Sequence, residues 1–339
     1  MKIRKLAQEE HQNTRRLYEE VFSEDSSSFV DYYYTEKVKD NQIYVVEEDG
    51  EIQAMLHLNP YQVMVGGTEK TAHYIVAVAT RESYRKRGYM AVLLRQAIHD
   101  MHEAGEAFTF LMPAAEAIYL PHGFRTVYEQ EQRFFTGESP EKNEDCNYEE
   151  LREEDCEELA RTAETYLAGN YQVYAKRSRE YYERLKKECE SDGGKLLVCR
   201  KDGEITDLRL YENEEKKTEQ GKDDKPKIMM RIVDVRRMLM SAALRQLAAF
   251  CFQVTDPIVE ENNCCLVVTG TEYSGIMLMD GKEENSEGTI TVAALSSLLF
   301  GARSAEEISR EEGVRLSARL CGELGKIVPL NKIYLNEVV

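Results

Sequence analysis

The sequence of 339 residues contains no tryptophan and no apolar run long enough to span a membrane. Its longest apolar stretch, around residues 239–252, is interrupted by Arg245, whereas a membrane helix needs about 18 predominantly apolar residues in a row. The N-terminal segment MKIRKLAQEEHQ lacks the apolar core of a signal peptide. We therefore expect a cytoplasmic protein without a membrane partner.

The usual metal and nucleotide motifs are also missing. None of the eight cysteines is spaced as C-x-x-C. His99 and His102 are three residues apart on a predicted helix but have no third ligand in register, so we expect no bound metal. There is no P-loop, no G-x-S-x-G elbow and no G-x-G-x-x-G loop. These absences argue against an NTPase, a serine hydrolase and a dinucleotide-dependent dehydrogenase.

Positive charge is scarce. Lysine and arginine total 44 against 62 aspartate and glutamate residues, which gives a formal net charge of −18 at pH 7. A nucleic-acid binder needs a basic surface that displaces the counterions of the phosphates, so we expect no nucleic-acid partner. An acidic protein is instead compatible with a cationic ligand.

The pattern of predicted elements divides the chain into three parts. Residues 1–136 alternate strands and helices, with a hairpin turn at Asp49-Gly50. Residues 137–227 are acidic and mostly helical, and end in the charged segment 212–227, which predicts a solvated loop. Residues 228–339 read as a strand at 228–233, helices over 235–252, several short strands, a helix-rich stretch and a strand-like tail at 332–339.

The most specific local pattern is a strand that runs through a basic loop into an amphipathic helix, in the sequence VATRESYRKRGYMA from Val78 to Ala91. At such a junction the first backbone N–H groups of the helix have no helical partner and favour an anion. Arg85 and Arg87 add charge, and Gly88 allows close approach of a phosphate. The alternative is an ordinary helix start with surface arginines.

This loop and a second block together resemble the GNAT superfamily of acyl-CoA-dependent N-acyltransferases. The superfamily's phosphate loop, Q/R-x-x-G-x-G/A, is similar to Arg85-x-x-Gly88-x-Met90, although Met90 replaces a small residue. Its later Y-x-x-x-G-F junction is similar to Tyr119-x-x-x-Gly123-Phe124.

A narrower resemblance extends over most of the chain. The blocks Ala117-Ile118-Tyr119, MMRIVDV at 229–235 and ALSSLLFG at 294–301 resemble the Eis (enhanced intracellular survival) family. This resemblance implies a mixed α/β (α+β) protein with three domains. They are an N-terminal GNAT domain at 1–136, a short degenerate GNAT-like domain at 137–227 and a sterol-carrier-protein-like domain at 228–339. It also implies a homo-oligomer, hexameric in known Eis-type proteins.

The resemblance implies a role for particular residues. Backbone groups of Val78, Ala79 and Thr80 would pair with the pantetheine arm of acetyl-CoA. The pyrophosphate would lie over the loop and helix start formed by Arg85, Lys86, Arg87, Gly88, Tyr89, Met90 and Ala91. Tyr119 would be the general acid that protonates the departing thiolate. The alternative for Tyr119 is a core tyrosine with a satisfied hydroxyl group.

The attacking amine must lose a proton, so a base is needed. In Eis-type proteins the C-terminal carboxylate serves as this base, which here would belong to Val339. His122 competes by residue type, and Glu116 is another nearby carboxylate, although surface positions are expected for both.

Two classes of function remain open. One is an acetyl-CoA-dependent N-acetyltransferase that acts on a primary amine of a cationic small molecule, such as an aminoglycoside, or on lysine. The other is a noncatalytic protein that binds acyl-CoA or a lipid and acts as a sensor. Amine-dependent release of free thiol from acetyl-CoA distinguishes them.

Overall fold

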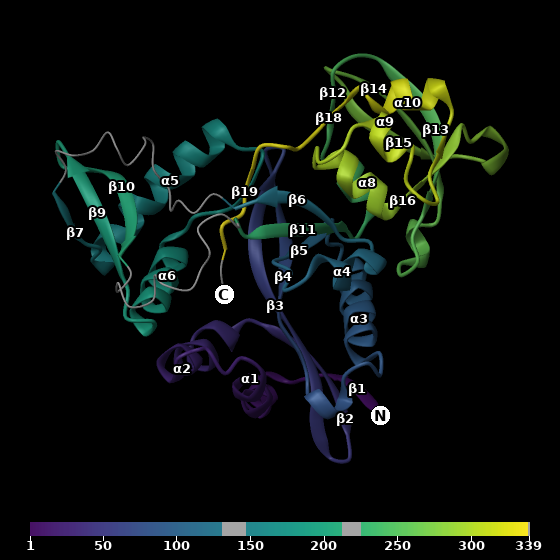
Figure 1. Cartoon of the computed structure of the whole chain (residues 1–339). Helices are drawn as coiled ribbons and strands as arrows, with labels where there is room; N and C mark the ends of the chain where they lie inside the picture. The colour runs from purple at the N-terminus through teal and green to yellow at the C-terminus, as the bar shows by residue number, and fades with distance from the viewer. Residues whose placement is uncertain (131–146, 212–224, 338–339) are drawn as a thin grey trace.

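The computed structural model describes residues 1–130, 147–211 and 225–337. Figure 1 shows three units: a central unit built on a large sheet, a smaller unit drawn in teal, and a C-terminal unit drawn in green and yellow. The last strand-like segment leaves the C-terminal unit and returns to the central sheet.

The first unit is an antiparallel meander followed by a parallel strand. The first five strands pair in chain order: β1 (Lys2–Lys5), β2 (Gln42–Glu48), β3 (Glu51–Val65), β4 (Thr68–Thr80) and β5 (Phe108–Leu111). The predicted turn at Asp49 and Gly50 joins β2 to β3, and both residues have positive φ, as a two-residue hairpin of this kind requires.

Helices cover both faces of this meander. The 3-10 helix η1 (Gln8–Thr14), α1 (Arg15–Val21) and α2 (Ser27–Thr35) lie on one face, and α3 (Tyr89–Glu103) lies on the other. Side chains alternate along β3, so Leu56 packs with α3 while Met55 packs with α1 and α2. The sheet is thus buried on both sides.

The sheet is completed by a strand from much later in the sequence. β11 (Lys227–Ile232) lies between β5 and β6 (Arg125–Glu129) and is antiparallel to both. We expected residue 228 to begin the C-terminal domain. The hydrogen bonding instead places this apolar strand in the first unit, because it fills the gap between two strands that flank a long loop.

The second unit packs two helices on a small sheet. The helices are α5 (Cys156–Asn170) and α6 (Arg179–Ser191), and the sheet has the order β10 (Glu204–Tyr211), β9 (Lys195–Lys201), β7 (Tyr148–Glu150). Its GNAT-like origin stays a prediction. Most of the predicted charged loop, residues 212–224, lies outside the described residues.

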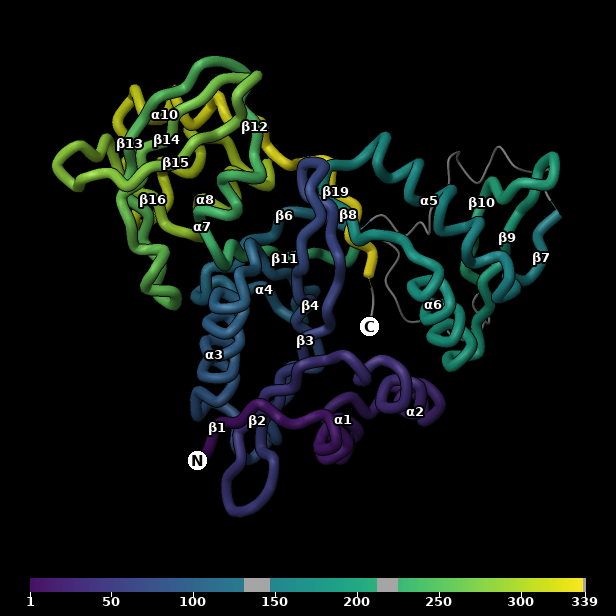
Figure 2. The backbone as a smooth tube through the Cα atoms, turned by 180° about the vertical axis from the view of Figure 1, so that it is seen from behind, coloured from purple at the N-terminus to yellow at the C-terminus, as the bar shows by residue number. Residues whose placement is uncertain are grey.

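Two short strands connect the units. β8 (Val173–Ala175) pairs with the far end of β3, and β19 (Ile333–Tyr334) pairs in parallel with β8. Figure 2 shows this arrangement from behind, with β8 and β19 beside the upper ends of β3 and β4. The tail is therefore docked at the junction of the first and second units.

The C-terminal unit has a five-stranded sheet covered by helices. Its sheet order is β15 (Gly275–Asp280), β14 (Cys265–Thr271), β13 (Ala248–Thr255), β16 (Gly288–Thr291) and β17 (Arg315–Leu316). The covering helices are α8 (Val292–Leu299), α9 (Ala305–Ile308) and α10 (Ala318–Leu324), and the small pair β12 (Ala243–Leu244) and β18 (Ile327–Val328) closes one end.

The helices that we predicted over 235–252 are only partly present. α7 covers Val235–Leu239, and the apolar run that follows leads into β13. β13 pairs with β14 on one side and β16 on the other, so most of its residues are buried. A short apolar run of this kind does not distinguish a buried strand from a helix.

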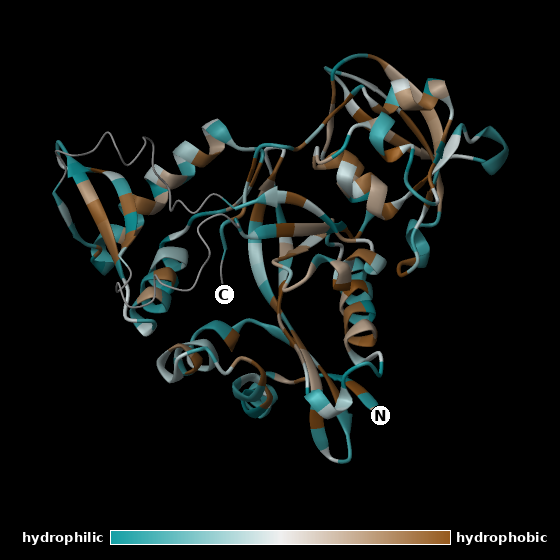
Figure 3. Ribbon diagram, in the orientation of Figure 1, coloured by the Kyte–Doolittle hydropathy of each residue, from teal (hydrophilic) through white to brown (hydrophobic). Residues whose placement is uncertain are grey.

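Hydrophobic residues concentrate in the strands and in α8, as Figure 3 shows in brown. In the part of the chain that the structure describes, no helix has the length and apolar character required to cross a lipid bilayer.

Candidate active site

The central feature of the first unit is a split between two parallel strands. β4 pairs with β5 at Tyr74 and Phe110, and the described residues show no further pairing between them. β4 then bends, because Ala77 adopts φ of +48° and two residues of β4 face one residue of β3. A β-bulge of this kind turns a strand away from its neighbour.

Beyond the bulge, one edge of β4 is open. Val78, Ala79 and Thr80 remain close to β3 on one side, through Ala79 opposite Met55, and no strand of the described part of the chain pairs with them on the other. Their backbone groups on that side, apart from the Thr80 carbonyl, which accepts a hydrogen bond from Arg85, are therefore available to an extended ligand. These are the three residues that the resemblance assigned to the pantetheine arm.

The open edge leads directly into the basic loop. Lys86 and Gly88 adopt φ of +62° and +82°, and the backbone N–H groups of residues 86–88 donate no hydrogen bond within the described residues. Left-handed residues that alternate in this way form a concave nest of N–H groups that binds anions. The loop is braced by Arg85 Nε, which donates to the Thr80 carbonyl at 3.2 Å.

The side chains of the loop are exposed, apart from the helix start. Arg85, Lys86 and Arg87 are solvent-exposed, and the Arg87 guanidinium lies 4.4 Å from the centre of the Tyr84 ring. Tyr89 is buried and donates to the Glu48 carboxylate. Met90 is half-buried and packs on the apolar cluster under α3, while Ala91 follows in the first turn. The unusual Met90 is therefore partly taken up by packing against the core.

Tyr119 lies on the side of the sheet that α3 covers. It ends the short helix α4 (Glu116–Tyr119), and its ring belongs to the apolar cluster that also contains Val78 and residues of α3. The ring is 7% exposed and meets Phe124 edge to face at 5.9 Å. Unlike most of the other buried tyrosines, Tyr119 makes no hydrogen bond through its hydroxyl group within the described residues. Burial raises the pKa of the Tyr119 phenol.

The two alternative bases are both poorly suited to accept a proton. His122 is buried, and burial together with Arg95 and Arg231 lowers the pKa of its imidazole. Glu116 accepts hydrogen bonds from Thr126 and, at 3.2 Å, from Lys227, which lower the pKa of its carboxyl group. Val339 lies outside the described residues.

Sequence reasoning missed a buried polar cluster between α2 and α6, which we call the junction cluster: Tyr32, Lys37, Tyr61 and Glu188. Lys37 Nζ lies 3.1 Å from the Tyr61 hydroxyl oxygen and 3.5 Å from Glu188 Oε2. Burial raises the pKa of the Glu188 carboxyl group, against the effect of Lys37. A lysine in an otherwise polar stretch gives no signal of burial in the sequence.

Two further polar groups near this cluster have no hydrogen-bond partner among the described residues. They are both side-chain atoms of Asn59, next to Tyr61 on β3, and Oε2 of Glu337 in the tail. Oε1 of Glu337 accepts a 2.6 Å bond from Arg177. Buried polar atoms of this kind are usually satisfied by a ligand or water.

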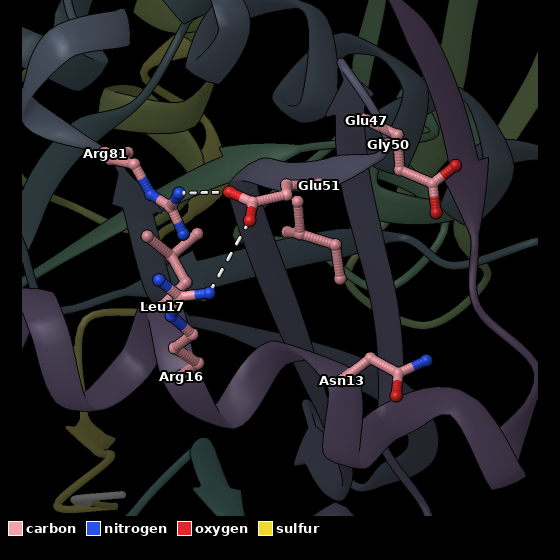
Figure 4. Close-up of a pocket in the computed structure, with 8 residues that line it drawn as sticks. Asn13, Arg16, Leu17, Glu47, Gly50, Glu51 and Arg81 are labelled. Carbon is pink, nitrogen blue, oxygen red and sulfur yellow. Dashed lines mark hydrogen bonds and ion pairs between the residues drawn. The ribbon is translucent and has the colours of Figure 1, made fainter.

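The structure also has a separate hollow of about 240 Å³ beside α1. Figure 4 shows its charged lining, in which Arg81 bonds Glu51 at 2.7 Å and Arg16 lies 3.6 Å from the same carboxylate. The Glu51 carboxylate is thus already paired with both arginines of this lining.

Comparisons with known proteins identify two domains in the chain. Residues 2–127 match the family model of the GNAT acetyltransferase domain, and residues 235–336 match that of the sterol carrier protein domain. GNAT acetyltransferases take their acetyl group from acetyl-CoA. No curated protein matches the sequence.

Three solved structures share the fold over nearly the whole chain. A probable N-acyltransferase from Enterococcus faecalis is 15% identical, with a TM-score of 0.76 and coverage of 100% of this chain and 99% of that one. A GCN5-related N-acetyltransferase from Kribbella flavida is 14% identical, with a TM-score of 0.74 and full coverage of both chains. Eis1 from Mycobacterium abscessus is 13% identical, with a TM-score of 0.68 and coverage of 96% and 97%.

The predicted mixed α/β fold is thus confirmed at both ends of the chain, by a GNAT domain and a sterol carrier protein domain. The bulged strand, the nest and Tyr119 all lie in the first of these. The chain therefore carries a GNAT acetyltransferase domain and a C-terminal sterol carrier protein domain, and it shares its fold with Eis1 from Mycobacterium abscessus.

Proposed function

We propose that the protein is an acetyl-CoA-dependent N-acetyltransferase that acts on a primary amine of a cationic small molecule, of the aminoglycoside kind, or of lysine. The observation that carries this proposal is the hydroxyl group of Tyr119, which no described residue binds, on an otherwise buried ring in the same cluster as Val78 of the open edge of β4. A core tyrosine with a satisfied hydroxyl group would not have this arrangement.

The described residues fit acetyl-CoA, which supplies an activated acetyl group as a thioester. The backbone groups on the open edge of β4, along Val78, Ala79 and Thr80, suit the amides of a pantetheine arm. The nest at residues 86–88 suits a pyrophosphate, and a Cβ on Gly88 would meet nothing within 4 Å, so the space above it is free for a ligand. Tyr119 then donates its proton to the departing thiolate.

The acceptor is proposed to enter from the face of α2. The Tyr61 hydroxyl group accepts a hydrogen bond from Lys37, which follows α2. Asn59 is two residues before Tyr61 and therefore shares its side of β3, and Tyr74 is the partner of Asn59 on β4. The carboxylates of Glu188, from the second unit, and Glu337, from the tail, lie in the same region. The negative charge of each acts to raise the pKa of the Tyr61 hydroxyl group. Oε2 of Glu337 has no hydrogen-bond partner among the described residues, and a buried carboxylate oxygen of this kind favours a cationic amine.

The base is proposed to be the terminal carboxylate of Val339. The support is the docking of the described tail: Ile333, Tyr334, Leu335 and Glu337 are all buried. Gln130 Nε2 donates to the Leu335 carbonyl at 3.2 Å. A frayed tail would not be held in this way.

The alternative, a noncatalytic sensor of acyl-CoA or lipid, makes a different prediction for one assay. The protein is incubated with acetyl-CoA and either kanamycin, Nα-acetyl-lysine or no amine, and free thiol is followed with a disulfide reagent. Thiol release that depends on an amine supports the enzyme. Tight binding of CoA by calorimetry, without turnover of either amine, would support the sensor. A cytoplasmic location and a homo-oligomer, hexameric as in Eis-type proteins, remain part of the proposal.

A further inference from the structure

Among the described residues, Arg231 has the largest fully buried side chain, and it connects three parts of the molecule. It lies on β11, and its Nε donates to the His122 carbonyl at 2.8 Å, three residues after Tyr119. Its Nη2 donates at 2.6 Å to Asp256 Oδ1, in the C-terminal unit. Neither side chain of this ion pair is exposed to solvent.

The loop that carries Tyr119 is held at both ends by the same strand. β11 pairs with Leu111 before the loop and with Arg125 after it. The Arg231 side chain extends from β11 and contacts the middle of this loop, at His122. At Gly123, where φ is +86°, an added Cβ would lie 3.2 Å from Arg231 Nε and 3.3 Å from Val292 in α8. The loop therefore rests directly on Arg231 and on the C-terminal unit.

Asp256 is itself fixed by several donors. The backbone N–H groups of Ile258 and Val259 donate to Oδ1 at 2.8 and 3.2 Å, and Asn262 Nδ2 donates to Oδ2 at 2.8 Å. Val259 and Ile258 pack in the same apolar cluster as Tyr119 and α3. One carboxylate thus joins a loop of the C-terminal unit to the arginine that holds the Tyr119 loop.

We infer that Arg231 and Asp256 are positioning residues through which the C-terminal domain fixes the orientation of Tyr119. A buried charge is tolerated only where its hydrogen bonds are satisfied. The Arg231 guanidinium meets this condition, because it donates to the His122 carbonyl, to the Asp256 carboxylate and, at 2.7 Å, to the Ile232 carbonyl. By this geometry the C-terminal domain affects kcat through the position of Tyr119, and not through the binding of acetyl-CoA. The inference rests on the proposed role of Tyr119 as proton donor.

The test is the substitution Arg231→Lys, which keeps the charge beside Asp256 but cannot reach all three acceptors with one nitrogen. We expect kcat with kanamycin or Nα-acetyl-lysine to fall between about 10-fold and 100-fold, as for a displaced catalytic group. KM for acetyl-CoA should not change. Hydrogen exchange of residues 116–124 should accelerate. Asp256→Asn should have the same effects.

The control is Arg319→Lys, at an exposed arginine with similar partners. Arg319 also binds a carboxylate, that of Glu287, and a backbone carbonyl, that of Ala249 at 2.7 Å, but lies away from the Tyr119 loop. This variant should leave kcat and the exchange of residues 116–124 unchanged. Equal effects of Arg319→Lys and Arg231→Lys would overturn the inference, as would failure of both Arg231→Lys and Asp256→Asn to fold.

A double substitution separates this inference from the proposed function. In a Tyr119→Phe background, Arg231→Lys should cause no further loss of kcat, because its effect passes through the missing hydroxyl group. A further loss of 10-fold would overturn the inference while leaving the role of Tyr119 intact. If Tyr119→Phe alone leaves kcat unchanged, the proposed role of Tyr119 is wrong. Hydrogen exchange then still shows whether Arg231 and Asp256 hold the loop.

Discussion

Arg177 and Glu337 form an ion pair with 2.6 Å between Nη1 and Oε1, and solvent reaches almost none of either side chain. Arg177 follows β8, and its guanidinium lies 4.1 Å from the centre of the Tyr181 ring. Glu337 is the last described residue of the tail. The tail is thus held by a buried charge pair in addition to the backbone pairing of β19.

The substitution Glu337→Gln should therefore destabilise the protein and lower turnover. Removing one partner of a buried ion pair costs about 3–5 kcal/mol, because the remaining charge is left uncompensated. The free energy of unfolding in urea measures this loss. The control is Lys176→Met, which breaks the neighbouring but exposed pair of Lys176 with Glu69 and should cost less than about 1 kcal/mol. Equal losses would show that the buried pair has no special role.

Extension of the chain beyond Val339 should abolish amine-dependent turnover. An added C-terminal tag replaces the carboxylate by a neutral amide, whereas the same tag at the N-terminus leaves it intact. We expect both tagged proteins to bind CoA equally in calorimetry and only the N-terminally tagged one to release thiol. Similar kcat values for the two would eliminate Val339 as the base.

Gly88→Asp should raise KM for acetyl-CoA by 10-fold or more, since it places a carboxylate against the phosphates. Gly67→Asp is its matched control, because Gly67 has the same φ of +82° and an added Cβ there also meets nothing within 4 Å. Both variants carry the same backbone strain, but only Gly88 lies in the nest. Arg85→Ala should raise KM to a smaller extent. Normal CoA binding by Gly88→Asp would show that the loop is not the phosphate site.

Tyr119→Phe should lower kcat by about 100-fold with little change in KM for acetyl-CoA, as expected for loss of a general acid. Because burial raises the pKa of Tyr119 above its ordinary value of about 10, its hydroxyl group stays protonated through pH 9. The wild-type kcat should therefore show no alkaline decline up to pH 9. Tyr174→Phe, which removes only a hydrogen bond to Glu164, serves as the control.

His57 should make the protein less stable in mild acid. It is fully buried, with Nδ1 2.9 Å from the Tyr33 hydroxyl oxygen, and burial lowers its pKa to about 3. The unfolded chain takes up a proton near pH 6.5 and the folded chain does not, so stability falls as pH decreases below 6.5. The loss from this group between pH 6.5 and 5 is at most about 2 kcal/mol. Urea unfolding of His57→Gln should lack this loss, whereas the half-exposed His99→Gln should retain it.

Local patterns indicate those parts of the proposed site that are continuous in the sequence. The strand Val78–Thr80, the loop and Tyr119 each have a recognisable local sequence, and the structure brings all of them into one region. The predicted hairpin at Asp49 was confirmed for the same reason, because a two-residue turn depends on its own residues.

Features that depend on distant partners could not be predicted in this way. Lys37 and Glu188 meet only because α6 packs against α2. Nothing in the sequence of β11 shows that its neighbours are β5 and β6. One signal was present, however: Arg231 interrupts the apolar run MMRIV, and a charge in the middle of a buried strand indicates a specific partner.

The place of β11 in the sheet has a consequence for synthesis of the protein on the ribosome. The sheet of the first unit cannot close until residue 232 has emerged, so a nascent chain of the first 130 residues has two strand edges, on β5 and β6, with nothing between them. Unpaired edges of this kind favour aggregation and slow folding. A fragment that stops after the GNAT match at residue 127 is therefore expected to depend on chaperones or to precipitate, whereas the longer nascent chain closes its own sheet.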